Sequence, residues 1–177
     1  MRIAPIVPGT RPELAAQEAA IALVRGRVSP LYQVLLNSPP VAHGWEQMLS
    51  AIRNHNSLSA ALRELVILRV AVLNNAPYEF EAHAPIALAA GVSPASITCI
   101  QSETPLKMPW NKQEALSEIE HLAIRLTDAM TRDIVVADAL YNEVQQHFTA
   151  QNQLDLVATI AAYNMVSRLL VALKIGH

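Results

Sequence analysis

Apolar residues recur along most of this chain at the three- and four-residue spacing that is typical of amphipathic α-helices. In the second half, this spacing predicts three helices with apolar stripes over residues 116–126, 134–148 and 154–169. In the first half, Ser or Thr followed closely by proline marks predicted helix starts near residues 10, 29, 38 and 93, and Thr10-Arg11-Pro12-Glu13 has the pattern of a capping box. No stretch alternates apolar and polar residues over a convincing strand length. The predicted fold class is therefore all-α, with about seven to nine helices.

The segment 101–112, QSETPLKMPWNK, contains two prolines and has no helical period, which predicts a loop between two helical halves. No obvious linker divides the chain, and 177 residues are enough to bury a sizeable core. We therefore expect residues 1–177 to form a single domain.

The helix predicted over residues 59–73, with Ser59 as its N-cap, is apolar on almost every side. Its polar members, Arg63, Glu64 and Arg69, point in three different directions, so the whole helix is expected to be buried. A carboxylate among aliphatic side chains is costly unless it is paired, and its pKa tends to rise. Glu64 is therefore either half of a structural salt bridge, with Arg63, Arg69 or an arginine of another helix, or a catalytic acid.

The next predicted helix begins within NNAPYEFEAH, residues 74–83, with Asn75 or Ala76 as its cap. Glu79 and His83 lie one turn apart on the same face, where the carboxylate can accept an imidazole N–H and raise the pKa of the ring. The pair is either an ordinary surface pair or a polarised pair beside a helix N-terminus, which favours an anionic ligand. No second Glu-x-x-x-His and no His-x-x-x-His accompanies it, so no metal site is predicted.

The composition of the chain argues against several classes of function. Hydrophobic residues make up 52% and charged residues 16%, which is apolar for a soluble protein and suggests surface buried between subunits. The net charge is −2 and no basic stripe stands out, so nucleic-acid binding has no support. No apolar run reaches the roughly 18 residues that span a bilayer, and the N-terminus does not resemble a signal peptide, so we expect a cytoplasmic protein without membrane partners. The single cysteine, Cys99, excludes chemistry that needs two thiols in one subunit.

Residues 63–97, RELVILRVAVLNNAPYEFEAHAPIALAAGVSPASI, resemble the core of the carboxymuconolactone decarboxylase / alkylhydroperoxidase D superfamily. The shared pattern is an Arg-Glu helix, a helix start that leads to Glu-x-x-x-His, and Gly-Val-Ser before the following helix. NSPPVAHGWEQML and AAYNMVSRLLVAL also fit longer members. The resemblance implies an alkylhydroperoxidase D-like helical bundle with its core motif at 59–97. It also implies a homo-oligomer, such as a dimer, trimer or hexamer.

The peroxidase branch of this family uses Cys-x-x-Cys followed by x-x-x-His. Alignment on His83 places its two cysteines at Ala76 and Glu79, its intervening histidine at Tyr78 and its preceding glutamate at Glu64. Because a thiolate is the nucleophile in peroxide reduction and disulfide exchange, the missing thiols argue against a peroxidase of this type.

The decarboxylase branch carries Glu-x-x-x-His at this place, and its reaction needs no cofactor. The resemblance implies that His83 delivers or abstracts a proton, that Glu79 orients it, that Glu64 relays a proton or holds the pair, and that Tyr78 donates to an enolate. The substrate would be a small carboxylate or lactone. Arg63 is a further candidate for substrate binding and is equally well explained as the partner of Glu64. The other candidates, each also explicable as core or interface, are His43, Trp45, Tyr163 and Arg168.

Three hypotheses follow. The favoured one is a cofactor-independent acid–base enzyme, a decarboxylase or a related lyase or isomerase, that acts through the Glu79–His83 pair. The second is a thiol-dependent peroxidase or antioxidant protein that uses Cys99. The third is a non-catalytic helical oligomer, which a closed environment around His83 without a pocket would favour.

Overall fold

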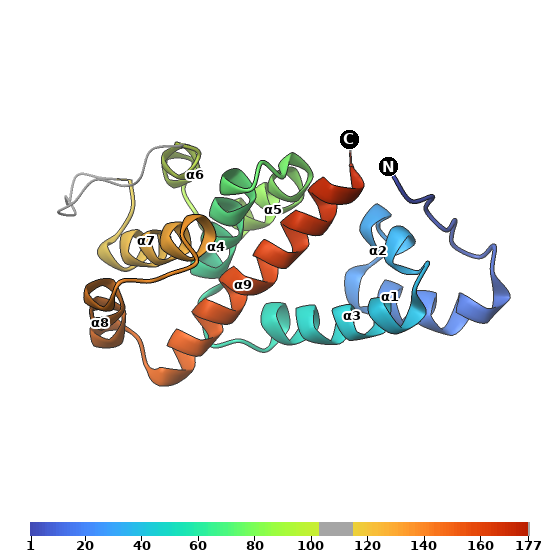
Figure 1. The fold of residues 1–177 in the computed structure, drawn as a ribbon, viewed down its shortest axis with the longest axis horizontal. Helices are drawn as coiled ribbons and strands as arrows, with labels where there is room; N and C mark the ends of the chain where they lie inside the picture. The colour runs from blue at the N-terminus through green and yellow to red at the C-terminus, as the bar shows by residue number, and fades with distance from the viewer. Residues whose placement is uncertain (103–114, 177) are drawn as a thin grey trace. The chain divides into compact units, whose positions relative to one another are not determined.

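The computed structural model describes residues 1–102 and 115–176, and within these ranges every regular element is a helix (Figure 1). The all-α prediction is therefore confirmed, and the expected loop 101–112 lies outside the described residues apart from its first two positions. The elements are η1 (Pro12–Leu14), α1 (Ala15–Arg25), α2 (Pro30–Leu35), α3 (Pro39–Asn54), α4 (Ala60–Leu73), α5 (Pro77–Ala89), α6 (Pro94–Ile100), α7 (Glu118–Arg132), α8 (Asp138–His147) and α9 (Ala150–Leu173).

The chain forms two compact units, one made of Met1–Asn56 with Leu170–His177 and the other of Ser57–Leu169. The second unit contains α4 to α8 and most of α9, and every residue of the core motif lies in it. Our expectation of one domain over residues 1–177 stays a prediction.

Helix α4 is the centre of the second unit and packs against α5, α6 and α7. Nine of its fourteen residues are buried, so the prediction of a helix surrounded on all sides is confirmed. Its apolar side chains join a core that continues into α5, α6 and α7: Leu65, Leu68, Ala87, Val92, Ile100, Leu116 and Ile124. Burial on every side explains why its sequence carries no amphipathic stripe.

Some of the helix caps agree with those expected from the sequence, and others do not. Ser59 accepts a hydrogen bond from the backbone N–H of Leu62, as expected for the N-cap of α4. Ser117 and Glu120 form a reciprocal capping box at the start of α7. The capping box expected at Thr10 is wrong, because the Thr10 hydroxyl donates to the carbonyl of Val7 and a short 3₁₀ turn precedes α1.

A buried ion pair ties α4 to α7. Arg69, which is fully buried, donates Nε and Nη2 to the two carboxylate oxygens of Asp128 at 2.6 and 2.7 Å. Its Nη1 also donates to the carbonyl of Ile100 at 2.7 Å and to that of Ser102, at the end of α6. Because this arginine is satisfied by Asp128 and by backbone, it is not the partner of Glu64.

The first unit holds its own buried carboxylate, Glu46 of α3. It accepts hydrogen bonds from Arg25 Nε at 2.9 Å, from Ser50 Oγ at 2.6 Å and from the Tyr32 hydroxyl. Burial works to raise the pKa of Glu46, but the bonds from Arg25, Ser50 and Tyr32 outweigh it and lower that pKa. Burial, with the bond to Glu46, raises the pKa of Tyr32. This set of contacts fastens α1 and α2 to α3.

Helix α9 is long and apolar enough, by length and composition, to cross a membrane. Its most apolar 18-residue window has a mean hydropathy of 1.7, which differs from our expectation that no segment reaches this limit. Half of that window is buried, and core helices of soluble proteins share this composition. The helical structure is compatible with a cytoplasmic location, which stays a prediction.

Candidate active site

Glu64 and His83 form the shortest contact of the candidate site. Glu64 lies in the second turn of α4, and His83 lies in the second turn of α5. The imidazole Nδ1 is 2.6 Å from Glu64 Oε2, and the two residues are 1% and 5% exposed. Because α4 is buried on every side, its single carboxylate has its partner inside the protein rather than in solvent. The hydrogen-bonded partner of Glu64 is a histidine. Of the arginines that the sequence allowed, Arg63 lies at ion-pair distance from Glu64 and Arg69 pairs with Asp128.

The other imidazole nitrogen faces two groups. Nε2 of His83 lies 3.2 Å from Glu79 Oε1, one helical turn earlier on α5, and 3.5 Å from the hydroxyl of Tyr163 on α9. The Tyr163 ring meets the imidazole edge to face, with centroids 5.2 Å apart and planes at 89°. Glu79 and Tyr163 are buried as well. The predicted i, i+4 pair is therefore present, but it is buried rather than on the surface.

The two carboxylates favour the protonated, positively charged form of His83. Burial alone would lower the pKa of this imidazole, but the hydrogen bonds to Glu64 and Glu79 and the charges of both carboxylates outweigh burial and raise its pKa. The imidazolium form therefore persists to a higher pH than in an ordinary histidine. We call Glu64, His83 and Glu79 the carboxylate–histidine triad.

Arg63 lies next to the triad and approaches Glu64 without a hydrogen bond. Its Nε is 3.8 Å from Glu64 Oε1, beyond hydrogen-bond distance. That Nε is buried and has no hydrogen-bond partner among the described residues. An unmatched buried donor costs free energy, so this N–H is available to an acceptor that enters beside Glu64.

Of the other residues predicted for the site, one lies on α5 and two lie on α3. Tyr78 is half-buried on α5 next to Glu79, and the tyrosine whose ring contacts His83 is Tyr163. His43 is exposed and Trp45 is buried, but both lie on α3 in the other unit, so their role at the site stays a prediction.

Arg168 belongs to a polar network centred on Asn164. The Asn164 carboxamide oxygen accepts from Arg168 Nη1 at 2.8 Å and from Asn74 Nδ2 at 2.9 Å. Its Nδ2 donates to Thr131 Oγ1 at 2.9 Å and to the carbonyl of Ile160 at 3.0 Å. Asn164 is buried, and it thereby links α9 to the ends of both α4 and α7.

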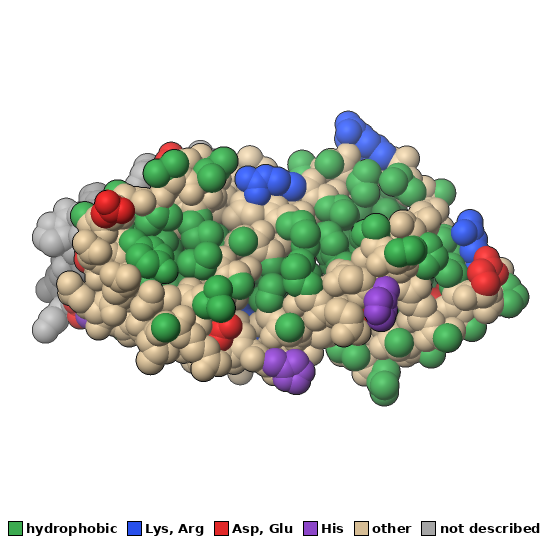
Figure 2. All heavy atoms as spheres, turned by 60° about the horizontal axis from the view of Figure 1, so that its bottom comes forward, with side chains coloured by type: hydrophobic (Ala, Val, Ile, Leu, Met, Phe, Trp, Pro, Cys, Tyr) green, Lys and Arg blue, Asp and Glu red, His purple; other side chains and the backbone are tan. Residues whose placement is uncertain are grey.

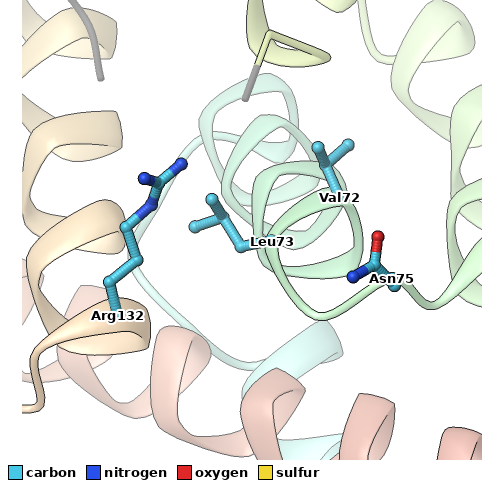
Figure 3. A pocket seen from close by; sticks show the side chains of 4 residues that line it. All are labelled: Val72, Leu73, Asn75 and Arg132. Carbon is cyan, nitrogen blue, oxygen red and sulfur yellow. The ribbon is translucent and has the colours of Figure 1, made fainter. Parts of the chain in front are cut away.

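A pocket of about 300 Å³ lies where α4 and α7 end (Figure 3). It is lined by Val72, Leu73, Asn75 and Arg132, and no member of the triad is among these residues. This pocket could not be predicted from the sequence, because Leu73 and Arg132 lie far apart in the chain.

Residues 39–102 match the model of the carboxymuconolactone decarboxylase family, and this segment contains the whole triad. An uncharacterized protein of Bacillus subtilis (strain 168), YdfG, is 27% identical over 120 residues, which cover 67% of this chain and 77% of that protein.

Several solved structures share the fold. An uncharacterized peroxidase-related protein from Ralstonia eutropha JMP134, an alkylhydroperoxidase AhpD core, superposes with a TM-score of 0.79 at 14% identity, over 98% of this chain and 90% of that one. A peroxidase-related protein from Silicibacter sp. TM1040 gives 0.77 at 15% identity, over 97% and 87%. The debrominase Bmp8 in complex with 2,3,4-tribromopyrrole gives 0.77 at 13% identity, over 99% and 90%. Identities this low show the fold alone.

The fold is all-α and alkylhydroperoxidase D-like. The fold and the match over residues 39–102 agree with the resemblance to the carboxymuconolactone decarboxylase / alkylhydroperoxidase D superfamily seen at residues 63–97.

Proposed function

We propose that this protein is a cofactor-independent acid–base enzyme in which His83 transfers a proton to or from carbon. The observation that carries the proposal is the buried imidazole held between Glu64 and Glu79, with a raised pKa. Buried ionisable groups with specific charge partners and perturbed pKa values concentrate at functional sites. A purely structural role would be served as well by apolar side chains of similar volume, which avoid the desolvation of three charges.

The proposed substrate is a small carboxylate or lactone, and the proposed reaction is a decarboxylation or a related lyase or isomerase step. In a decarboxylation, the carboxylate leaves as carbon dioxide and the electron pair of the broken C–C bond forms an enolate. The proton on His83 Nε2 then moves to carbon, while Glu64 keeps Nδ1 protonated and the ring in position. Solvent returns the proton to His83.

Arg63 is the proposed anchor for the negative charge of the substrate. With His83 protonated, the triad carries two negative charges and one positive charge, so an anion would be repelled without a further cation. Arg63 supplies that cation within 4 Å of Glu64, and its buried Nε has a donor to offer. Glu79 and Tyr163, which both lie near Nε2, would orient the imidazole as the proton donor.

The test uses a panel of β-oxo acids and carboxylated butenolides in deuterated buffer, with carbon dioxide release and deuterium incorporation followed by NMR. The wild type and Cys99→Ser should turn over the same substrate, and His83→Gln should lose about 100-fold or more in rate, the usual contribution of a general acid. Melting curves confirm that each variant is folded. Undiminished turnover by His83→Gln would refute the proposal, and peroxide consumption that is lost in Cys99→Ser would establish thiol chemistry instead.

A second candidate, a non-catalytic helical oligomer, is favoured by the burial of the triad. His83 is only 5% exposed, and the pocket at Arg132 does not include it. Retention of the fold and oligomeric state by His83→Gln, with no turnover of the panel by the wild type, would favour this candidate.

We also propose that the protein is a homo-oligomer. The second unit exposes large apolar side chains at Ile134 (80%), Val135 (75%) and Leu154 (68%). Figure 2 shows hydrophobic side chains gathered into patches on one face, with few charged side chains among them. Exposed apolar patches of this kind mark interfaces. Light scattering coupled to size-exclusion chromatography measures the mass directly, and a monomer at all concentrations would contradict this proposal.

A further inference from the structure

We infer that the outer face of α1 is the surface through which two copies of this chain pack, antiparallel and across a two-fold axis. Helix α1 packs against α3 and buries Glu18 and Ile21 on its inner side. Its exposed residues are all apolar: Ala15, Ala16, Ala19, Ala20, Leu23 and Val24. We call these six residues the α1 face. The inference rests on the homo-oligomer proposed above and names one of its interfaces.

The α1 face reverses the usual distribution of polarity on a surface helix. Such a helix normally turns its apolar stripe to the core and its charged side chains to water. Here the charged Glu18 is on the buried side, where it accepts the backbone N–H of Gly9 at 2.8 Å. Leu23, on the outer side, is 87% exposed, and Val24 is 48% exposed. Burial of this leucine is favourable, and a two-fold contact buries it once in each copy.

The arrangement of small and large side chains favours an antiparallel pair. Alanines occupy the first part of the α1 face, and Leu23 and Val24 occupy its end. In an antiparallel pair centred on Ala20, Ala16 of one copy lies level with Val24 of the second copy. The small end of each face therefore receives the large end of the other, which is the alternation that dense packing requires. A parallel pair would set large beside large and leave the alanines apart.

The charges at the two ends of the helix favour the same orientation. Glu13 lies just before α1 and Arg27 just after it, and both are exposed. They are equally far from Ala20 in the chain, seven positions before and seven after it. The antiparallel register therefore places Glu13 of each copy level with Arg27 of the other. Exposed ion pairs add little affinity, but opposite charges at matching positions set the orientation of two partners.

Cross-linking tests the register directly. In a Cys99→Ser background, Ala20→Cys places one thiol per chain at the proposed two-fold axis. Oxidation with copper phenanthroline should join two copies through a disulfide, which a non-reducing gel shows as a dimer. Ala139→Cys in the same background is the matched control, because it puts an exposed thiol on α8 in the other unit. We expect the Ala20→Cys variant to cross-link at least about tenfold faster than this control.

The mass of the protein tests the energetics of the contact. Leu23→Glu should raise the dissociation constant of the pair at least about 100-fold, because both copies lose a buried leucine. Its exposed position in the single chain leaves the fold intact, which circular dichroism checks. Glu13→Arg and Arg27→Glu should each weaken the pair by a few-fold, and the double variant should restore it. Light scattering coupled to size-exclusion chromatography over a range of concentrations measures all four variants.

The outcomes separate this inference from the proposal of a homo-oligomer. An oligomeric wild type whose mass is unchanged in Leu23→Glu, or an Ala20→Cys variant that cross-links no faster than Ala139→Cys, would overturn the inference and leave the homo-oligomer in place. A wild type that is monomeric at every concentration would overturn both. Binding of a monomeric wild type to anionic phospholipid vesicles, lost in Leu23→Glu, would assign the α1 face to a membrane instead.

Discussion

His83 and Glu64, 19 positions apart, meet at 2.6 Å between Nδ1 and a carboxylate oxygen in the interior of the second unit. The i, i+4 partner of the histidine, Glu79, lies farther away, at 3.2 Å from the opposite nitrogen. The imidazole is thus held by a tertiary contact on one side and a local helical contact on the other. The tertiary contact fixes which nitrogen faces the core, and it leaves Nε2 as the atom that can exchange a proton.

Glu64→Gln should lower the pKa of His83. The neutral amide replaces a charged acceptor. Burial, which disfavours the imidazolium and lowers the pKa, is then opposed by Glu79 alone. We expect a fall of about one unit or more, equivalent to about 1.4 kcal/mol per unit. NMR titration of the His83 ring protons measures it. Glu143→Gln is the matched control, because Glu143 pairs with Arg125 on the surface of the same unit. An unchanged pKa in Glu64→Gln would contradict the assignment of Glu64 as the main partner.

Stability should depend on pH through the same histidine. The pKa of His83 is raised in the folded state, so its contribution is fully present below the ordinary histidine pKa of about 6.5. It is lost as the pH rises through the folded-state pKa. The free energy of unfolding of wild type minus that of His83→Gln should therefore decrease from pH 6 to 9, as measured by urea titration. A difference that grows over this range would mean that the neutral imidazole is the stabilised form.

The Arg69–Asp128 pair should be the most sensitive polar contact of the second unit. Asp128→Ala leaves a fully buried guanidinium without its carboxylate, which costs about 3–5 kcal/mol. Glu143→Ala is the comparison, because it removes an equally short bond to Arg125 at a half-exposed site, where ion pairs contribute below about 1 kcal/mol. Urea unfolding of both variants at one pH measures the two losses. Equal losses would mean that burial does not set the strength of these pairs.

The sequence predicts the helices and much of the triad because the relevant signals are local. The uniform apolar content of residues 59–73 predicts a buried helix, and its one carboxylate therefore predicts a buried acid. The spacing of Glu79 and His83 predicts their shared face. The partner of Glu64 could not be predicted from the sequence alone, since Arg63 and Arg69 are nearer in the chain and equally able to pair.

Contacts across helices account for what the sequence does not show. Arg69 is taken by Asp128, 59 positions away, and Tyr163 approaches His83 from 80 positions away. The expected roles of Tyr78, His43 and Trp45 rest on neighbourhood in the chain or on resemblance, and they stay predictions. The pocket at Arg132 depends on the meeting of two helix ends, which no periodicity encodes.

Asn164→Ala should lower the stability of the second unit, because this one amide holds the ends of α4 and α7. The substitution removes the acceptor of Asn74 and Arg168 and the donor to Thr131. Buried groups left without partners cost about 1–3 kcal/mol each, so the loss should exceed that of Asn152→Ala, whose bonds to Ser57 are at the surface. Urea unfolding gives this comparison. A loss no larger than that of Asn152→Ala would show that the ends of α4 and α7 keep their positions without Asn164.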